Sequence, residues 1–158
     1  MSVKPVPWGC GTVTLWVVSR GTVRLIGSME PAFGVEELAC LAGGDGAVGH
    51  AEVRGGGSVV LMGDAWPEWP APPGFLCLGV GDADVVHCRA VAVGVISVTG
   101  VTHVIFGDRV GRVRDPLGGL YRFRTRVEEL TPQERERRLG DAESTKAMEC
   151  VQSAGFFP

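Results

Sequence analysis

The sequence has 158 residues, 45% of them hydrophobic, and a formal net charge of −3. This size and hydrophobic content predict one globular domain, or two half-domains that share a core, and they exclude wholesale disorder. The apolar runs are far shorter than the roughly 18–20 residues that span a bilayer, so we expect no membrane partner. The five cysteines have no CxxC spacing and the chain starts without a signal-peptide pattern. Together these features predict reduced thiols in a cytoplasmic protein.

Basic residues are unevenly spread, and nine of the fifteen lie between Arg109 and Arg138. Acidic residues are interleaved with them, so we expect solvated faces with paired charges. A nucleic-acid site would need a one-sided basic surface with interleaved aromatic residues. The sequence therefore predicts no nucleic-acid partner.

The first half of the chain predicts a strand, a helix and three further strands. Residues 12–19 are rich in β-branched and aromatic residues, as strands are, and apolar residues recur at helical spacing over residues 22–33. Gly27, Ser28 and Pro31 interrupt that helix, so we expect it to be short or bent. Residues 35–41 are a candidate short strand, and a hairpin around three glycines is expected from residues 48–54 and 58–63.

The second half repeats this order after a proline-rich segment, residues 65–73, which is expected to be a linker because four of its nine residues are proline. The pattern then predicts a strand at 75–80, a helix at 83–93 with Asp82 as N-cap, and strands at 95–99, 102–106, 111–115 and 120–127. A capping box, Thr131 to Glu134, with proline at the first helical position starts a helix that should reach about residue 139. Residues 141–158 fit either a frayed helix or a tail.

The repeated order predicts an α+β chain with two βαβββ modules. The glycine turn at residues 55–57 and the Asp-Pro-Leu-Gly-Gly turn at 115–119 each precede an apolar run, which supports the repeat. The predicted division is a first module (1–64), a linker (65–73), a second module (74–130), and a C-terminal helix and tail (131–158). Paired modules of this kind tend to form a curved sheet with a cleft.

An ordered series of segments carries a family resemblance over residues 3–139: VKPVP (3–7), TVT (12–14), AFGVEEL (32–38), GHAEVR (49–54), SVVLMGDAWPE (58–68), GDRVGRVRDPLGG (107–119) and VEELTPQE (127–134). The series resembles the PhnB-like branch of the vicinal oxygen chelate superfamily, which also holds glyoxalase I, fosfomycin-resistance enzymes, extradiol dioxygenases and bleomycin-resistance proteins. The resemblance implies paired βαβββ modules that form an open, eight-stranded barrel-like sheet with a central cleft. It also implies a homodimer.

The resemblance further implies that the chelate site is absent. Metal-dependent relatives carry His, Gln or Glu ligands at four positions, which correspond here to Thr14, Val60, Phe75 and Arg122. Valine and phenylalanine cannot ligate a metal, arginine would repel one, and threonine is at best a weak ligand. We therefore expect neither a metal nor another cofactor, which removes the chemistry that depends on a bound cation.

Strand alternation predicts which side chains line the cleft: Thr14, Trp16, Phe75, Cys77, Leu120, Arg122 and Arg124. In relatives, the segment with His103, Phe106, Asp108 and Arg109 rims the cleft, and Asp108 and Arg109 are expected to pair and fix the turn. The resulting set of candidate ligand-binding residues is Thr14, Trp16, Phe75, Cys77, Phe106, Arg109 and Arg122. Such a lining suits a flat or hydrophobic ligand with a negative or carbonyl group. Alternatively, Trp16 and Phe75 only fill the barrel, and Cys77 is a small buried hydrophobe.

Three residues are candidates for proton transfer. His50 and Glu52 share a strand face two residues apart, although this spacing also fits a hydrogen-bonded sheet face. His103 could act as a general base near neutral pH.

Three functions remain open from the sequence. The first is a metal-free protein that sequesters a hydrophobic or aromatic small molecule, as bleomycin-resistance-like relatives do. The second is a metal-independent enzyme of natural-product metabolism that catalyses cyclisation, isomerisation or hydrolysis. The third is a degenerate family member that acts through protein contacts.

Overall fold

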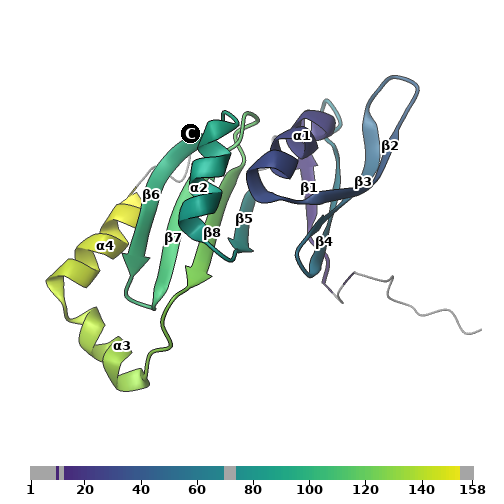
Figure 1. Cartoon of the computed structure of the whole chain (residues 1–158). Coiled ribbons are helices and arrows are strands. Elements are labelled where there is room, and N and C mark those ends of the chain that lie inside the picture. The colour runs from purple at the N-terminus through teal and green to yellow at the C-terminus, as the bar shows by residue number, and fades with distance from the viewer. Residues whose placement is uncertain (1–9, 11–12, 70–73, 154–158) are drawn as a thin grey trace, which may run out of the picture. The chain divides into compact units, whose positions relative to one another are not determined.

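The computed structural model describes residues 10, 13–69 and 74–153, and the chain divides into two compact units (Figure 1). Unit 1 is Met1–Gly74 and unit 2 is Phe75–Pro158. Residue 12 of the predicted first strand, residues 70–73 of the predicted linker and the last five residues lie outside the described residues. No helix of the described part is both long and apolar enough to cross a bilayer.

Unit 1 is a βαβββ module. Its elements in chain order are β1 (Trp16–Ser19), α1 (Thr22–Phe33), β2 (Glu36–Ala42), β3 (Val48–Gly55) and β4 (Ser58–Asp64). The sheet order is β1-β4-β3-β2, with β1 parallel to β4 and the other neighbours antiparallel. The parallel contact between the first and last strands requires a crossover, which α1 begins.

Helix α1 runs without a break over the 12 residues that the sequence pattern marks, so the expectation of a short helix was wrong. Its buried side chains, Leu25, Ile26, Met29 and Ala32, recur at helical spacing and dock on the sheet. Burial of this stripe outweighs the weak propensity of the interior glycine, serine and proline. Gly34 ends the helix in the left-handed region, with φ 68°.

Unit 2 has the same topology and adds two helices. Its elements are β5 (Phe75–Gly79), α2 (Ala83–Ala92), β6 (Ile96–Val104), β7 (Asp108–Arg114), β8 (Leu120–Arg126), α3 (Pro132–Leu139) and α4 (Ala142–Ser153). The sheet order is β5-β8-β7-β6, and β5 is parallel to β8. The chain is thus α+β, with two four-stranded mixed sheets. That the two sheets line one shared cleft stays a prediction.

Four predicted elements differ in the structure. Strand β1 begins at Trp16, so residues 13–15 of the predicted first strand lie before it. The two strands predicted at 95–99 and 102–106 are replaced by one strand, β6 (Ile96–Val104). Its pairing with β7 has register shifts on either side of Thr99. Strand β7 starts at Asp108, three residues before the predicted start, because the turn is made at Gly107, with φ 80°. The ambiguous C-terminal segment contains a 12-residue helix, α4.

Each sheet has one face covered by its own helix, and we call the opposite one the far face. Cα partners in neighbouring strands project their side chains to the same face. In unit 1 the fully buried partners Ala51 and Met62 mark the helix-covered face, and in unit 2 Gly111 and Phe123 do so. The alternating residues, including Glu52 and Arg112, therefore belong to the far faces.

Candidate functional site

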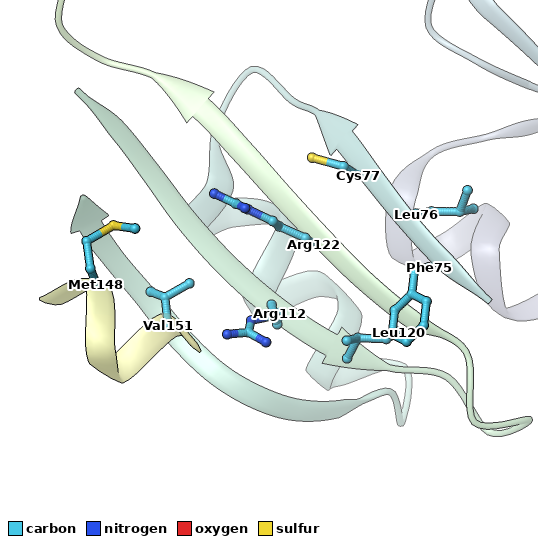
Figure 2. A pocket seen from close by; sticks show the side chains of 8 residues that line it. All are labelled: Phe75, Leu76, Cys77, Arg112, Leu120, Arg122, Met148 and Val151. Carbon is cyan, nitrogen blue, oxygen red and sulfur yellow. The ribbon is translucent and has the colours of Figure 1, made fainter. Parts of the chain in front are cut away.

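A pocket of about 470 Å³ lies on the far face of unit 2 (Figure 2). Strands β5, β7 and β8 form its floor, and helix α4 contributes one wall. The lining residues are Phe75, Leu76, Cys77, Arg112, Leu120, Arg122, Met148 and Val151. This volume falls in the usual range of small-molecule sites.

Three polar side chains on neighbouring strands form the polar part of the pocket lining. Cys77 pairs with Arg122, and Arg122 pairs with Arg112, so the three side chains stand on neighbouring strands of one face. Arg112 is only 2% exposed, whereas Arg122 is exposed, although both β7 and β8 are central strands. The thiol of Cys77 is free and the residue is exposed.

Helix α4 covers part of the same face. Val151 is buried against Val104 and Val110, and Met148 packs against this cluster. Figure 2 shows Met148 and Val151 on the side of the sheet that carries the two arginines. Together with Phe75 and Leu120 they make most of the lining apolar.

The structure brings three of the predicted ligand-binding residues into this pocket: Phe75, Cys77 and Arg122. Sequence reasoning missed Arg112, Met148 and Val151. Arg112 could have been found by extending the alternation of β7, which places it opposite Arg122.

Two predicted ligand-binding residues lie in unit 1, outside this lining. Trp16 starts β1, and its ring lies edge-on to that of Trp69 with the centroids 6.4 Å apart. Thr14 precedes β1. The structure thus gives Trp16 an aromatic neighbour from the proline-rich segment.

Phe106 and Arg109 stand apart from the pocket as well. Phe106 is 42% exposed in the turn between β6 and β7. Arg109 donates two hydrogen bonds of 2.6 Å to the carboxylate of Asp84 on α2, and the pKa of Asp84 is lowered mainly by this bonding. Arg109 is thus engaged with the helix that covers the opposite face.

The expected pairing of Asp108 with Arg109 is wrong. Asp108 is buried and accepts a hydrogen bond of 2.5 Å from Arg126, and it lies 3.6 Å from Arg124. Consecutive strand residues point to opposite faces, so Asp108 and Arg109 cannot share a partner surface. Asp108 instead joins the start of β7 to the end of β8.

Of the candidate proton-transfer residues, His50 and Glu52 are in contact, with 3.1 Å between Nε2 and Oε1 on the far face of unit 1.

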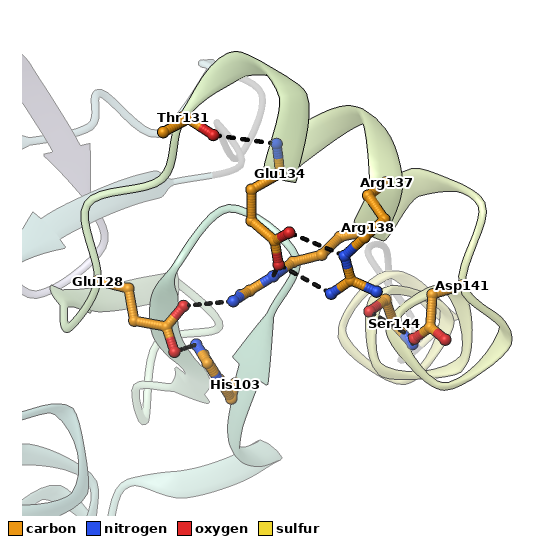
Figure 3. A network of polar contacts seen from close by, with 8 residues as sticks. All are labelled: His103, Glu128, Thr131, Glu134, Arg137, Arg138, Asp141 and Ser144. Atoms are coloured by element: carbon orange, nitrogen blue, oxygen red, sulfur yellow. Dashed lines mark hydrogen bonds and ion pairs between the residues drawn. The ribbon is translucent and has the colours of Figure 1, made fainter.

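The third candidate, His103, lies 3.7 Å from Glu128 Oε1 in a separate network (Figure 3). In that network Arg138 contacts both Glu128 and Glu134, at 2.7 and 2.9 Å. Hydrogen bonds from Arg137 and Arg138 lower the pKa of Glu134 to about 2. The network fastens α3 to the residues that follow β8.

The structure corrects one of the four positions carried over from metal-dependent relatives. Val60 pairs with Val53, which is 1% exposed and faces α1. The far-face residue at that level is Leu61, which pairs with Glu52 and with Trp16. Within the described residues no group of three or more His, Cys, Asp or Glu side chains could hold a metal ion. That the protein works without a metal stays a prediction.

Comparison with known sequences gives uncharacterized relatives. No family model matches the chain. Uncharacterized proteins of Mycobacterium bovis and Mycobacterium tuberculosis are each 33% identical over 98 residues. These matches cover 55% of this chain and 64% and 58% of the two relatives, so the chain spans less than two thirds of their length.

Comparison with solved structures shows the fold. TioX from Micromonospora sp. ML1 has a TM-score of 0.61 and 21% identity, over 75% of this chain and 98% of its own. A glyoxalase/bleomycin resistance protein/dioxygenase family enzyme from Burkholderia phytofirmans PsJN has a TM-score of 0.58 and 13% identity, over 72% and 97%. The fosfomycin resistance protein FosX from Mesorhizobium loti has a TM-score of 0.55 and 15% identity, over 80% and 97%. The chain therefore has the fold of the vicinal oxygen chelate superfamily, as its motifs predicted, whereas the PhnB-like branch stays a prediction.

Proposed function

We propose that this protein binds a hydrophobic or aromatic small molecule in the pocket of unit 2 and sequesters it without chemical change. The observation that carries the proposal is the lining of the pocket, where Phe75, Leu120, Met148 and Val151 surround two arginines. Mostly apolar pockets with a few placed polar groups are typical of small-molecule sites.

The solved structures of this fold include proteins named for fosfomycin and bleomycin resistance. Their identity to this chain is 15% or less, so they support the fold alone. The proposed ligand class is therefore argued from the residues that line the pocket. None of the four positions that carry metal ligands in relatives holds a His, Gln or Glu here: Thr14, Val60 or its neighbour Leu61, Phe75, and Arg122. This supports binding without a metal. A homodimer in the cytoplasm remains part of the proposal.

The test is a thermal-unfolding screen of the purified protein against aromatic compounds and divalent metals, with mass spectrometry of every mixture. A ligand at about 100 times its Kd adds roughly 2.7 kcal/mol of stability. We expect stabilisation by an organic compound whose mass is unchanged. Stabilisation by metal ions alone would contradict the metal-free assignment.

Two phenylalanines of equal exposure provide a matched control. Phe75 lines the pocket and is 43% exposed, while Phe106 is 42% exposed in a turn outside it. We expect Phe75→Ala to abolish the ligand-induced shift in Tm and Phe106→Ala to retain it. Equal shifts in both variants would place the ligand elsewhere.

A second function, a metal-independent enzyme, is favoured by the contact between His50 and Glu52. A carboxylate beside an imidazole can orient the ring and stabilise its protonated form. Under this alternative, a compound in the screen changes mass, and His50→Gln stops the change while ligand affinity is retained. His103→Gln tests the third candidate in the same way.

A further inference from the structure

We infer that the ligand of the unit 2 pocket is an organic anion, whose oxyanion group is held by Arg112 and Arg122 while its apolar body rests against Phe75 and α4. This inference rests on the proposed function and narrows its ligand class. It assigns Arg112, which no sequence pattern singled out, as a binding residue.

The first support is the placement of two cations side by side. Arg112 and Arg122 are Cα partners on neighbouring antiparallel strands, and both line the pocket (Figure 2). Side chains directly opposite each other start about 4.5–5.5 Å apart at Cβ, and like charges there destabilise a sheet. An anion held by both guanidinium groups would be attracted to each of them.

The second support is the charge balance of the lining. It contains two arginines and no carboxylate. Asp108, on the same face, is engaged with Arg126 and Arg124. Arg122 itself makes no ion pair with any residue that the structure describes.

Asp115, near the other end of β7, is committed to its own turn. It accepts hydrogen bonds from the backbone N–H groups of Leu117 and Gly119, at 2.6 and 3.0 Å. Asp108 and Asp115 thus have other structural tasks. Arg112, which has an interaction of its own within the chain, also lines the pocket.

The third support is the environment of these charges. Phe75, Leu120, Met148 and Val151 lower the local polarity, which strengthens charge-assisted hydrogen bonds. Guanidinium groups bind planar carboxylates through two parallel N–H···O bonds. The geometry therefore favours a carboxylate, or a similar oxyanion, attached to an aromatic or branched apolar body over a neutral compound of the same shape.

The experiment titrates the full chain with naphthalene-2-carboxylate, the isosteric naphthalene-2-carboxamide and inorganic phosphate, by calorimetry. We expect the carboxylate to bind at least tenfold more tightly than the amide. Arg122→Gln should weaken carboxylate binding by about 10- to 100-fold and leave the amide unchanged, because hydrogen bonds to charged groups contribute that much. Arg122 is exposed, so this variant should keep the fold.

Arg124→Gln is the matched control, because Arg124 lies on the same strand and face, two residues further along and outside the lining. It should bind the carboxylate as the unaltered protein does. Raising the salt concentration from about 0.01 M to about 1 M shortens the Debye length from about 30 to 3 Å. It should weaken carboxylate binding and leave amide binding unchanged.

The outcomes separate this inference from the proposed function. Equal affinity for the amide and the carboxylate overturns the anion site and leaves the hydrophobic pocket intact. Phosphate binding that Arg122→Gln removes, with no binding of either naphthalene compound, keeps the oxyanion site and overturns the hydrophobic ligand. If none of the three binds, both proposals are wrong.

Discussion

Units 1 and 2 bury the same sheet face with different pairs of side chains. Counted from the residue pairs that close the two turns, Gly55–Ser58 and Asp115–Gly119, the pair Ala51 and Met62 in unit 1 corresponds to Gly111 and Phe123 in unit 2. A larger residue on the last strand is thus accompanied by a smaller one on its neighbour. The helix-covered face preserves volume while its residues change, as close-packed interiors require.

The far faces of the two units differ in charge. At the next position toward the turns, unit 1 has Glu52 opposite Leu61, whereas unit 2 has Arg112 opposite Arg122. Glu52 already contacts His50. Within the described part of unit 1 the only helix, α1, lies on the other face, while α4 packs on the far face of unit 2. The two units therefore share one topology but have far faces of different charge. Of the two, the arginine-bearing far face of unit 2 has an apolar helix beside its charges.

The largest expected effect comes from emptying the core of unit 2. Phe123 is fully buried and its ring lies 6.0 Å from that of His87 on α2. Phe123→Ala should lower the free energy of unfolding by about 3–5 kcal/mol, because it removes the buried ring and leaves a cavity. Urea denaturation measures this loss, and the exposed Phe75→Ala should cost much less. Similar losses for both would contradict the assigned core.

The next effect tests whether the two core pairs are equivalent. A Cβ on Gly111 would lie 2.7 and 2.8 Å from ring carbons of Phe123, so Gly111→Ala should destabilise the protein by about 1–3 kcal/mol. In the background of Phe123→Met, which copies the unit 1 pair, the same substitution should cost less. A double-mutant cycle measures the coupling. Gly49→Ala, at an open position of β3, is the neutral control. If Gly111→Ala costs the same in both backgrounds, the two core pairs are not equivalent.

Much of the fold followed from sequence because each module contains strong local signals. The apolar stripe of α1, the capping aspartate of α2 and the glycine turns act over a few residues, and they were found where the pattern placed them. The site depended on longer-range facts. Arg109 donates hydrogen bonds to Asp84, which lies 25 residues away in the sequence. No local pattern shows that Arg109 pairs with Asp84 and not with the adjacent Asp108.

The same limit explains the missed pocket residues. The predicted strand 111–115 contains Arg112, but only the register between β7 and β8 sets Arg112 opposite Arg122. Helix α4 has a weak apolar pattern, so its docking on Val104 and Val110 becomes visible only when the strands that it covers are known. On β4, the predicted position was wrong by one residue, Val60 instead of Leu61. Successive side chains of a strand point to opposite faces, so this error placed the residue on the wrong face.

A moderate effect tests whether α4 is an integral wall of unit 2. Val151 is 3% exposed against Val104 and Val110. Val151→Ala should cost roughly 1.5–2 kcal/mol, because two methyl groups lose their buried contacts. Glu149→Ala, on the exposed side of the same helix, should change stability little. Hydrogen exchange should show faster exchange of the α4 amides in the valine variant, and unchanged exchange would mean that α4 does not depend on this contact.

The smallest effect concerns which side chain accepts hydrogen bonds from the free backbone N–H groups at the start of each unit's first helix. In unit 2, Asp82 caps α2 locally by accepting from the N–H groups of Asp84 and Val85. In unit 1, Gly21 offers no side chain, and Asp64, at the end of β4, accepts from Thr22 and Val48, both at 2.8 Å. Asp64→Ala should therefore cost about 1 kcal/mol, as the loss of a cap does.

The pH dependence of that cost identifies the carboxylate as the cause. Burial acts to raise the pKa of Asp64, but hydrogen bonds from Val48 and Thr22 outweigh it, so the pKa lies below its ordinary value of 3.8. A lowered pKa in the folded state means that the stabilisation is complete above the unfolded value and is lost as the pH falls through the folded one. The difference in urea midpoint between the unaltered protein and Asp64→Ala should thus be present at neutral pH and shrink below about pH 3.8. A difference that persists in acid would assign the effect to packing of the side chain, and unit 1 would then lack the remote cap that distinguishes it from unit 2.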